Sequence, residues 1–242
     1  MPTQASTFWL PKRGNTAADY EDAFAMEPAS GRFAVADGAT ESSFAGQWAR
    51  RLADAYVESP LRHARRWNEW LPRVQARWLA DVEGRDLPWY AEFKFEQGAF
   101  ATFLGLVLES SGRQPWHAVA IGDSCLFQVR DGKLFDLFPL SSSDEFGNQP
   151  PLLGSRSIAA DARRAEVRGH GSWRDADRFF LATDALAQWF LRQVEAGGMP
   201  WELLDDLFAA PDIQARGAEW IDELRDRHEI RNDDVTLIRV IA

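Results

Sequence analysis

The chain has 242 residues, of which 45% are hydrophobic and 26% are charged, and its formal net charge is −10. This length and composition suit a single globular domain over residues 1–242 with a sizeable core. The negative charge argues against a nucleic-acid partner, which it would repel, and no run of 18 apolar residues predicts a membrane span.

The one cysteine, Cys125, excludes an internal disulfide and is consistent with a reducing cytoplasm. The first fourteen residues lack the charged start and apolar core of a signal peptide. We therefore expect a cytoplasmic protein, with Cys125 as a small buried side chain.

The first half of the chain predicts a strand, two helices and then more strands. Residues 33–37, FAVAD, are typical of a short buried strand, and residues 44–58 have the apolar spacing of an amphipathic helix. A second helix is predicted over 60–82, where tryptophans recur at intervals of three and four and indicate a core-facing stripe. The runs 100–109 and 116–123 are rich in β-forming residues.

The second half predicts a hairpin, an irregular segment, helices and a last strand. Asp131-Gly132 between two apolar runs indicates a hairpin over 124–138. Residues 139–172, rich at first in Ser, Pro, Gly and Asn, predict an irregular, flap-like excursion. Beyond it the pattern predicts, in order, a strand, three helices and a closing strand: 178–184, 185–198, 200–209, 211–228 and 235–242. Strands joined by short turns favour antiparallel pairing, and the whole pattern indicates an α+β layered domain.

Aspartates mark the ends of the predicted strands. Three apolar strands finish at Asp37, Asp123 and Asp184, and the last strand is preceded by Asp233 and Asp234. In antiparallel sheets the end of one strand lies beside the start of its neighbour, so these acids can converge at one rim. Aspartate is also a common turn residue, and a turn explains any one of them alone.

Converging carboxylates repel one another unless a cation lies between them. The few histidines and the cysteine show no metal-ligand spacing, so an oxygen-preferring ion is favoured, Mg²⁺ or Mn²⁺ before Zn²⁺. Two such ions sharing a carboxylate suit the hydrolysis of a phosphate ester.

Six motifs in order resemble those of the metal-dependent protein phosphatases of type 2C. They include a Glu-Asp pair, an Asp-Gly motif, a Gly-x-x-Thr strand and a Gly-Asp-Ser hairpin, and they lie at residues 14–26, 35–40, 98–108, 121–134, 181–186 and 232–240. The resemblance covers nearly the whole chain. It implies a four-layer α-β-β-α sandwich, in which two antiparallel sheets are flanked by helix pairs.

The resemblance also implies a ligand set for two ions, Mg or Mn. Asp37 would bridge them, Gly38 would offer its backbone carbonyl, and Asp184 and Asp233 would complete the first site.

Glu21 and Asp22 would serve the second site, as ligands or by holding water. Asp37 and Asp22 would hold the metal-bound water whose hydroxide attacks phosphorus in line. In bacterial members the acid matching Asp123 holds a third ion together with Asp184.

Several positions depart from the family pattern. Ala39 stands where eukaryotic members have a proposed acid histidine, and Ala185 replaces a glycine. The family's phosphate-binding arginine is missing between Gly14 and Glu21, which leaves Arg13 or Lys12 as substitutes.

By this resemblance we expect a hydrolase that removes phosphate from phosphoserine and phosphothreonine, with a phosphorylated protein as substrate and a cognate kinase or its targets as partners. Two alternatives stay open. One is an inactive pseudophosphatase that binds a phosphoprotein or nucleotide. The other is a phosphatase of small phosphorylated metabolites.

Overall fold

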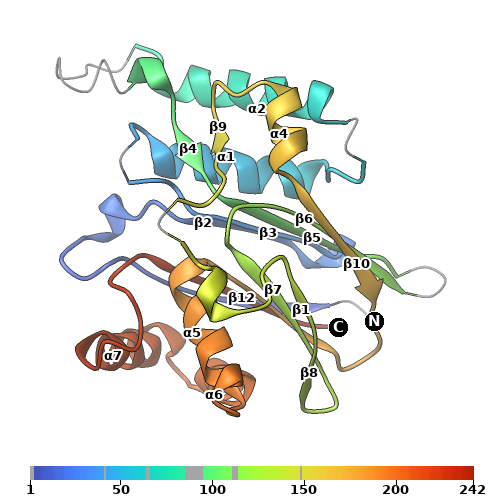
Figure 1. Ribbon diagram of the computed structural model, residues 1–242, viewed down its shortest axis with the longest axis vertical. Helices are drawn as coiled ribbons and strands as arrows, with labels where there is room; N and C mark the ends of the chain where they lie inside the picture. Colours follow the sequence, from blue (N-terminus) through green and yellow to red (C-terminus); the bar gives the residue numbers. More distant parts are fainter. Residues whose placement is uncertain (1–2, 41, 64–65, 85–94, 111–113, 148) are drawn as a thin grey trace.

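The computed structural model describes residues 3–40, 42–63, 66–84, 95–110, 114–147 and 149–242. Two five-stranded antiparallel sheets pack face to face, and helices cover the outer face of each (Figure 1). The predicted α+β sandwich of four layers is therefore confirmed.

One sheet, called here the C-terminal sheet, has the strand order β1-β12-β11-β7-β8. Every neighbouring pair in it is antiparallel. Its strands are β1 Gln4–Leu10, β7 Cys125–Arg130, β8 Lys133–Phe138, β11 Arg178–Ala182 and β12 Val235–Ile241. Asp131 and Gly132 connect β7 to β8 with positive φ angles of 52° and 71°, so the predicted hairpin is confirmed.

The other sheet, called here the N-terminal sheet, has the order β10-β6-β5-β3-β2 and is also antiparallel. Its strands are β2 Ala23–Glu27, β3 Arg32–Ala36, β5 Phe103–Leu108, β6 Pro115–Ile121 and β10 Val167–Ser172. A separate short pair joins β4 Phe100–Ala101 to β9 Leu153–Gly154.

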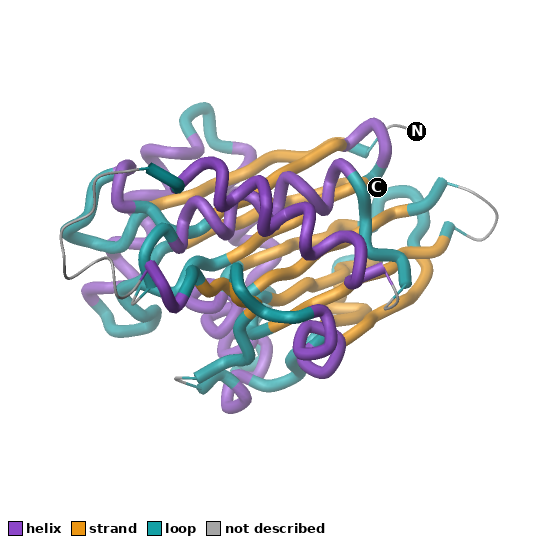
Figure 2. The backbone as a smooth tube through the Cα atoms, turned by 90° about the horizontal axis from the view of Figure 1, so that it is seen from above, coloured by secondary structure: helices purple, strands orange, loops and turns teal. Residues whose placement is uncertain are grey.

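Helices cover both outer faces, and α1 with its neighbours lies across the strands in Figure 2. On the N-terminal sheet α4 packs beside the pair α1 and α2, and on the C-terminal sheet α6 packs between α5 and α7. The helices are α1 Ala45–Glu58, α2 Trp67–Val82, α4 Ala159–Ala165, α5 Asp184–Glu195, α6 Pro200–Ala209 and α7 Ile213–Asp226, with short 3₁₀ turns η1 Ala17–Asp19, η2 Pro28–Ser30 and η4 Ser143–Glu145. None of the described helices is both long and apolar enough to span a bilayer.

Alternation along the strands builds the layers. In β3, Phe33 and Val35 are buried between the sheets, whereas Ala34 and Ala36 belong to the cluster under α1 and α2. Because successive side chains point to opposite faces, a strand covered on both sides is apolar throughout. This explains the unbroken apolar runs that precede the strand-end aspartates.

The tryptophan stripe lies in the core as predicted. Trp67, Trp70 and Trp78 are buried. The rings of Trp67 and Trp70 pack edge to face, with 5.4 Å between their centroids. The helix itself begins at Trp67 rather than at residue 60, because the chain has to reverse direction after α1 ends at Glu58.

The prediction of an irregular segment over residues 139–172 is wrong for its second part, which forms α4 and the edge strand β10. Glycines made β10 difficult to predict. A Cβ at Gly169 would lie 2.7 Å from the Phe138 ring, and one at Gly171 would lie 2.5 Å from the Trp116 ring. These glycines therefore make room for neighbouring aromatic rings instead of marking a loop.

No strand was predicted at Gln4–Leu10, where the structure places β1. This strand lies at the edge of its sheet and alternates exposed and partly buried residues along its first half. Its short polar start therefore gives a weak apolar pattern.

Candidate active site

Strand direction brings four of the predicted acids to one edge of the molecule. β3 and β6 are both antiparallel to β5, so their C-terminal ends, and with them Asp37 and Asp123, lie at the same edge. β11 ends and β12 begins at that edge too, which adds Asp184 and Asp233. All four line one cavity of about 660 Å³ between the two sheets.

The backbone around Asp37 is fixed by short hydrogen bonds. The carbonyl of Asp37 accepts from the amide of Thr102 at 2.8 Å, and Gly38 forms a β-bridge with Ala101. A Cβ at Gly38 would lie 2.7 Å from the carbonyl oxygen of Glu21 and 2.8 Å from the carbonyl carbon of Ala45. A side chain at Gly38 would therefore clash with the neighbouring backbone, so glycine is required there by packing alone. The absence of a Cβ also leaves room for a ligand to approach the Gly38 carbonyl.

Asp184 is the first residue of α5, directly after Thr183. Its Oδ1 accepts from the amide of Ala185 at 2.6 Å, an arrangement that the positive end of the helix dipole favours. Ala185 is buried at the second position of the helix. Alanine has the highest helix propensity of all residues, well above glycine. The departure from glycine at this position therefore needs no unusual backbone.

Asp123 follows Gly122, whose positive φ of 102° turns the chain out of β6. The side chain is buried, and within the described parts of the chain its Oδ1 has no hydrogen-bond partner. An unpartnered buried carboxylate oxygen is costly and indicates that a cation or water belongs beside it.

Asp22 is not among the residues that line the cavity and is only 3% exposed. Its Oδ2 accepts from the hydroxyl of Thr236 at 2.6 Å and from the hydroxyl of Thr183 at 2.9 Å. The Asp22 carboxyl also meets that of Asp37, and this contact raises the pKa of Asp37. Sequence reasoning missed both threonines, although Thr183 directly precedes Asp184 and Thr236 follows Asp234 by two positions.

Asp233 and Asp234 have different surroundings. Asp233 lines the cavity, and its backbone carbonyl accepts from Arg225 at 2.7 Å. Asp234 accepts from the amides of Lys12 and Glu21, each at 2.7 Å. Through these two hydrogen bonds Asp234 links the N-terminal segment to the start of β12.

Glu21 faces a second cavity of about 880 Å³ that adjoins the first. Lys12 lies there as well, with its Nζ 3.7 Å from Glu21 Oε2 and 3.2 Å from Thr40 Oγ1. Thr40 lines both cavities. The structure thus places Glu21 next to the four acids but not among the residues that line their cavity.

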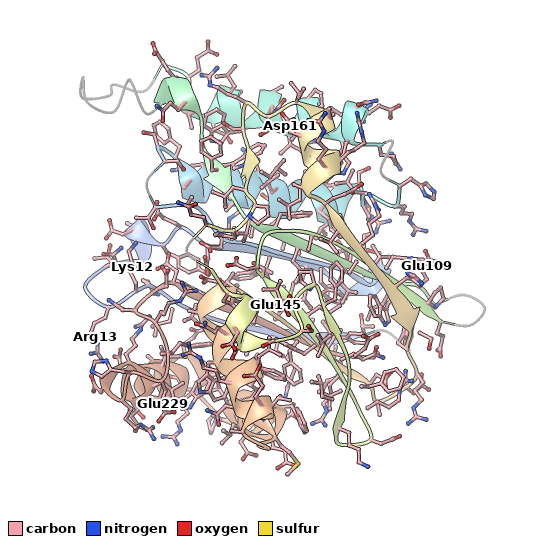
Figure 3. The ribbon with its side chains drawn as sticks, viewed as in Figure 1. Lys12, Arg13, Glu109, Glu145, Asp161 and Glu229 are labelled. Atoms are coloured by element: carbon pink, nitrogen blue, oxygen red, sulfur yellow. The ribbon has the colours of Figure 1, made fainter. Side chains whose placement is uncertain are left out.

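The prediction of Arg13 as a phosphate-binding residue is not supported by its position. Its guanidinium group pairs with Asp222 and Asp226 of α7, and its amide donates to Asn232. Figure 3 shows Arg13 beside α7, whereas Lys12 lies closer to the strand ends. Two acids of α7 hold the side chain on the outer surface.

Burial and mutual repulsion perturb the acids. Burial raises the pKa of Asp37 well above its usual range, and the charges of Asp22, Asp184 and Asp233 raise it further. Burial also raises the pKa of Asp22 to about 8 and that of Asp123 to about 7. Groups of this kind gain most from a bound cation, because it removes both penalties.

The shifts of Asp22 and Asp123 predict a pH dependence of stability in the presence of EDTA. Each folded-state pKa lies above the ordinary 3.8, at about 8 and about 7, so the folded chain retains protons that the unfolded chain has released. The free energy of unfolding should therefore fall as pH rises from the ordinary pKa of 3.8 to the folded-state values of about 7 and about 8. The fall is at most about 1.4 kcal/mol per pH unit for each group. Urea denaturation at several pH values measures the slope.

Asp22→Asn is the matched variant for this measurement, since asparagine keeps an oxygen that accepts from both threonines. It should flatten the upper part of the pH dependence. An equally steep slope in the variant would contradict the assignment to Asp22.

The residue types fit a hard divalent cation, because the acidic side chains that line the cavity are aspartates, whose carboxylate oxygens such ions prefer. In the described ranges, however, no three acidic, histidine or cysteine side chains are already arranged as a coordination group. Asp184 is paired with Arg231, and Glu21 faces Lys12. The ligand roles of Asp37, Gly38, Asp184, Asp233, Glu21, Asp22 and Asp123 remain predictions.

A double-sheet sandwich with acids gathered from both sheets defines the class of protein. The family model for protein phosphatase 2C matches residues 15–232. The chain belongs to this protein phosphatase family, as its motifs predicted. A comparison with curated protein sequences gave no match.

Solved structures share the fold at low sequence identity. The photosystem II phosphatase PBCP has a TM-score of 0.61 and 14% identity, covering 99% of this chain and 98% of that one. The catalytic domain of the serine/threonine phosphatase PstP, solved with two manganese ions, has a TM-score of 0.59 and 16% identity, covering 99% and 97%. PppA from Pseudomonas aeruginosa, a regulatory component of T6SS, has a TM-score of 0.58 and 18% identity, covering 100% and 98%.

Proposed function

We propose that this protein is a phosphatase dependent on Mg²⁺ or Mn²⁺ that hydrolyses phosphoserine and phosphothreonine in proteins. The observation that carries the proposal is the convergence of Asp37, Asp123, Asp184 and Asp233 on one cavity, in a chain of this family. The structure of PstP with two manganese ions supports a pair of ions.

Each residue would have a defined task. Asp37, Asp184 and Asp233 would hold one ion, and Asp37, the Gly38 carbonyl and Glu21 the second. The ions would supply an activated water for in-line attack on phosphorus and neutralise charge on the phosphoryl oxygens.

Asp22 would orient the attacking water together with Asp37. Its Oδ2 is held by two threonine hydroxyls, so its orientation is fixed before substrate arrives.

Lys12 is the better of the two predicted phosphate-binding residues. Its ammonium group lies beside Thr40, where the two cavities meet, and a flexible lysine can reach a phosphate as a point charge. Ala39 offers no proton donor at the cavity wall, so solvent water would protonate the leaving alcohol.

The test is hydrolysis of a phosphothreonine peptide and of p-nitrophenyl phosphate by the purified chain, with Mn²⁺ and with EDTA. We expect Mn²⁺-dependent release of phosphate from both. Turnover of p-nitrophenyl phosphate and of small phosphorylated metabolites without any of the peptide would exclude a protein phosphatase. Binding of Mn²⁺ and of the phosphopeptide in calorimetry without turnover would instead identify a pseudophosphatase.

A further inference from the structure

Arg231 is a cation inside an otherwise acidic cavity. Among the described residues that line this cavity, it carries the one positive side chain, and all the other charged ones are aspartates. It stands two positions before Asp233, in the turn that leads into β12.

The guanidinium group of Arg231 is bound to one particular acid. Its Nη2 donates to Asp184 Oδ2, and the backbone carbonyl of Arg231 accepts from the amide of Asp233 at 3.0 Å. The Nε is buried without a hydrogen-bond partner in the described parts of the chain. The side chain is therefore held at the cavity by its bond to Asp184, although 39% of it is exposed to solvent.

Asp123 lines the same cavity as Arg231 and Asp184. Asp123 has an unpartnered buried oxygen and no other described cation lines the cavity. Arg231 is thus the positive charge that the described part of this cavity offers to both Asp184, which it bonds, and Asp123.

We propose that the guanidinium group of Arg231 takes the place of a metal ion between Asp123 and Asp184, so that this chain binds two divalent ions and no third. A carboxylate has about four lone-pair positions, so Asp184 keeps about two after bonding Arg231 and Ala185, and one of them can serve an ion shared with Asp37. A further divalent ion beside Asp123 would meet the guanidinium charge at close range. The inference rests on the proposed metal-dependent function.

The experiment counts Mn²⁺ ions bound per chain, by calorimetry and by electron paramagnetic resonance of unbound Mn²⁺, on the full chain without substrate. The wild type should bind two ions. Arg231→Gln should bind three, because the guanidinium charge is gone, and Arg231→Lys should stay at two. The double variant Arg231→Gln with Asp123→Asn should return to two, whereas Asp123→Asn alone should leave the wild-type count unchanged.

Arg216→Gln is the matched control, since it makes the same change of charge on the exposed face of α7. Circular dichroism melting in EDTA establishes that each variant is folded. An unchanged count in Arg231→Gln, or a third ion in the wild type that Asp123→Asn removes, would overturn the inference. Phosphatase activity is measured separately, so a rise from two ions to three in an inactive protein would refute the proposed function and leave this inference intact.

Discussion

Asp37→Asn should lower Mn²⁺-dependent phosphatase activity by more than about 100-fold while the fold is retained. Altering even an outer partner of a metal ligand typically costs 10–100-fold, and Asp37 is predicted to contact both ions. The change removes one charge and almost no volume. Initial rates on the phosphothreonine peptide over a range of Mn²⁺ concentrations measure the effect.

Asp37→Asn should also differ from the wild type in how Mn²⁺ changes its thermal stability. Because Asp22, Asp184 and Asp233 repel the Asp37 charge, its removal should leave the melting temperature in EDTA unchanged or higher. Added Mn²⁺ should then stabilise the variant less than the wild type. Asp161→Asn is the matched control, since this acid lies on α4 at the outer surface (Figure 3). Activity within tenfold of the wild type would exclude Asp37 as the bridging ligand.

Asp177→Ala should destabilise the protein by about 3–5 kcal/mol, the range for removing one partner of a buried ion pair. Asp177 is 1% exposed and accepts from Arg130 at 2.6 Å, from Gln128 at 2.8 Å and from the amide of Arg174 at 3.1 Å. Gln128 in turn accepts from the indole of Trp116, which belongs to the opposite sheet. The substitution therefore leaves several buried donors unpaired.

Urea denaturation measures this loss, which corresponds to a fall of roughly 6–20 °C in Tm for a chain of this length. Asp226→Ala is the control, because the side chains of Asp226 and of its partner Arg13 are both exposed and such pairs are worth about 0–1 kcal/mol. A loss as small as that of the control would show that the Asp177 network contributes little.

The sequence allowed the gathering of the acids to be predicted, because the signal was local. An apolar run that stops at Asp37, Asp123 or Asp184 identifies a buried strand and its end, and antiparallel pairing then places those ends together. The hairpin at Asp131-Gly132 was predictable for the same reason, since two residues determine the turn.

Side-chain partners across the fold were not predictable. Arg13 and Lys12 are neighbours in sequence, yet Arg13 pairs with Asp226 of α7, whereas Lys12 donates to Thr40 near the strand ends. Arg231 could be noticed only as a cation close to Asp233, and its bond to Asp184 depends on how two distant turns meet. Such choices are made by tertiary packing, for which a single sequence carries no periodic signal.

The hydrogen bonds of Asp22 have a consequence for how the protein folds. The aspartate precedes the edge strand of the N-terminal sheet, while the hydroxyls of Thr183 and Thr236 come from the C-terminal sheet, 161 and 214 residues away. Contacts of such high sequence separation require very long loops to close, which costs conformational entropy. The candidate site is therefore complete only when the two sheets have docked, and we expect it to be absent from any partly folded chain in which the sheets are apart.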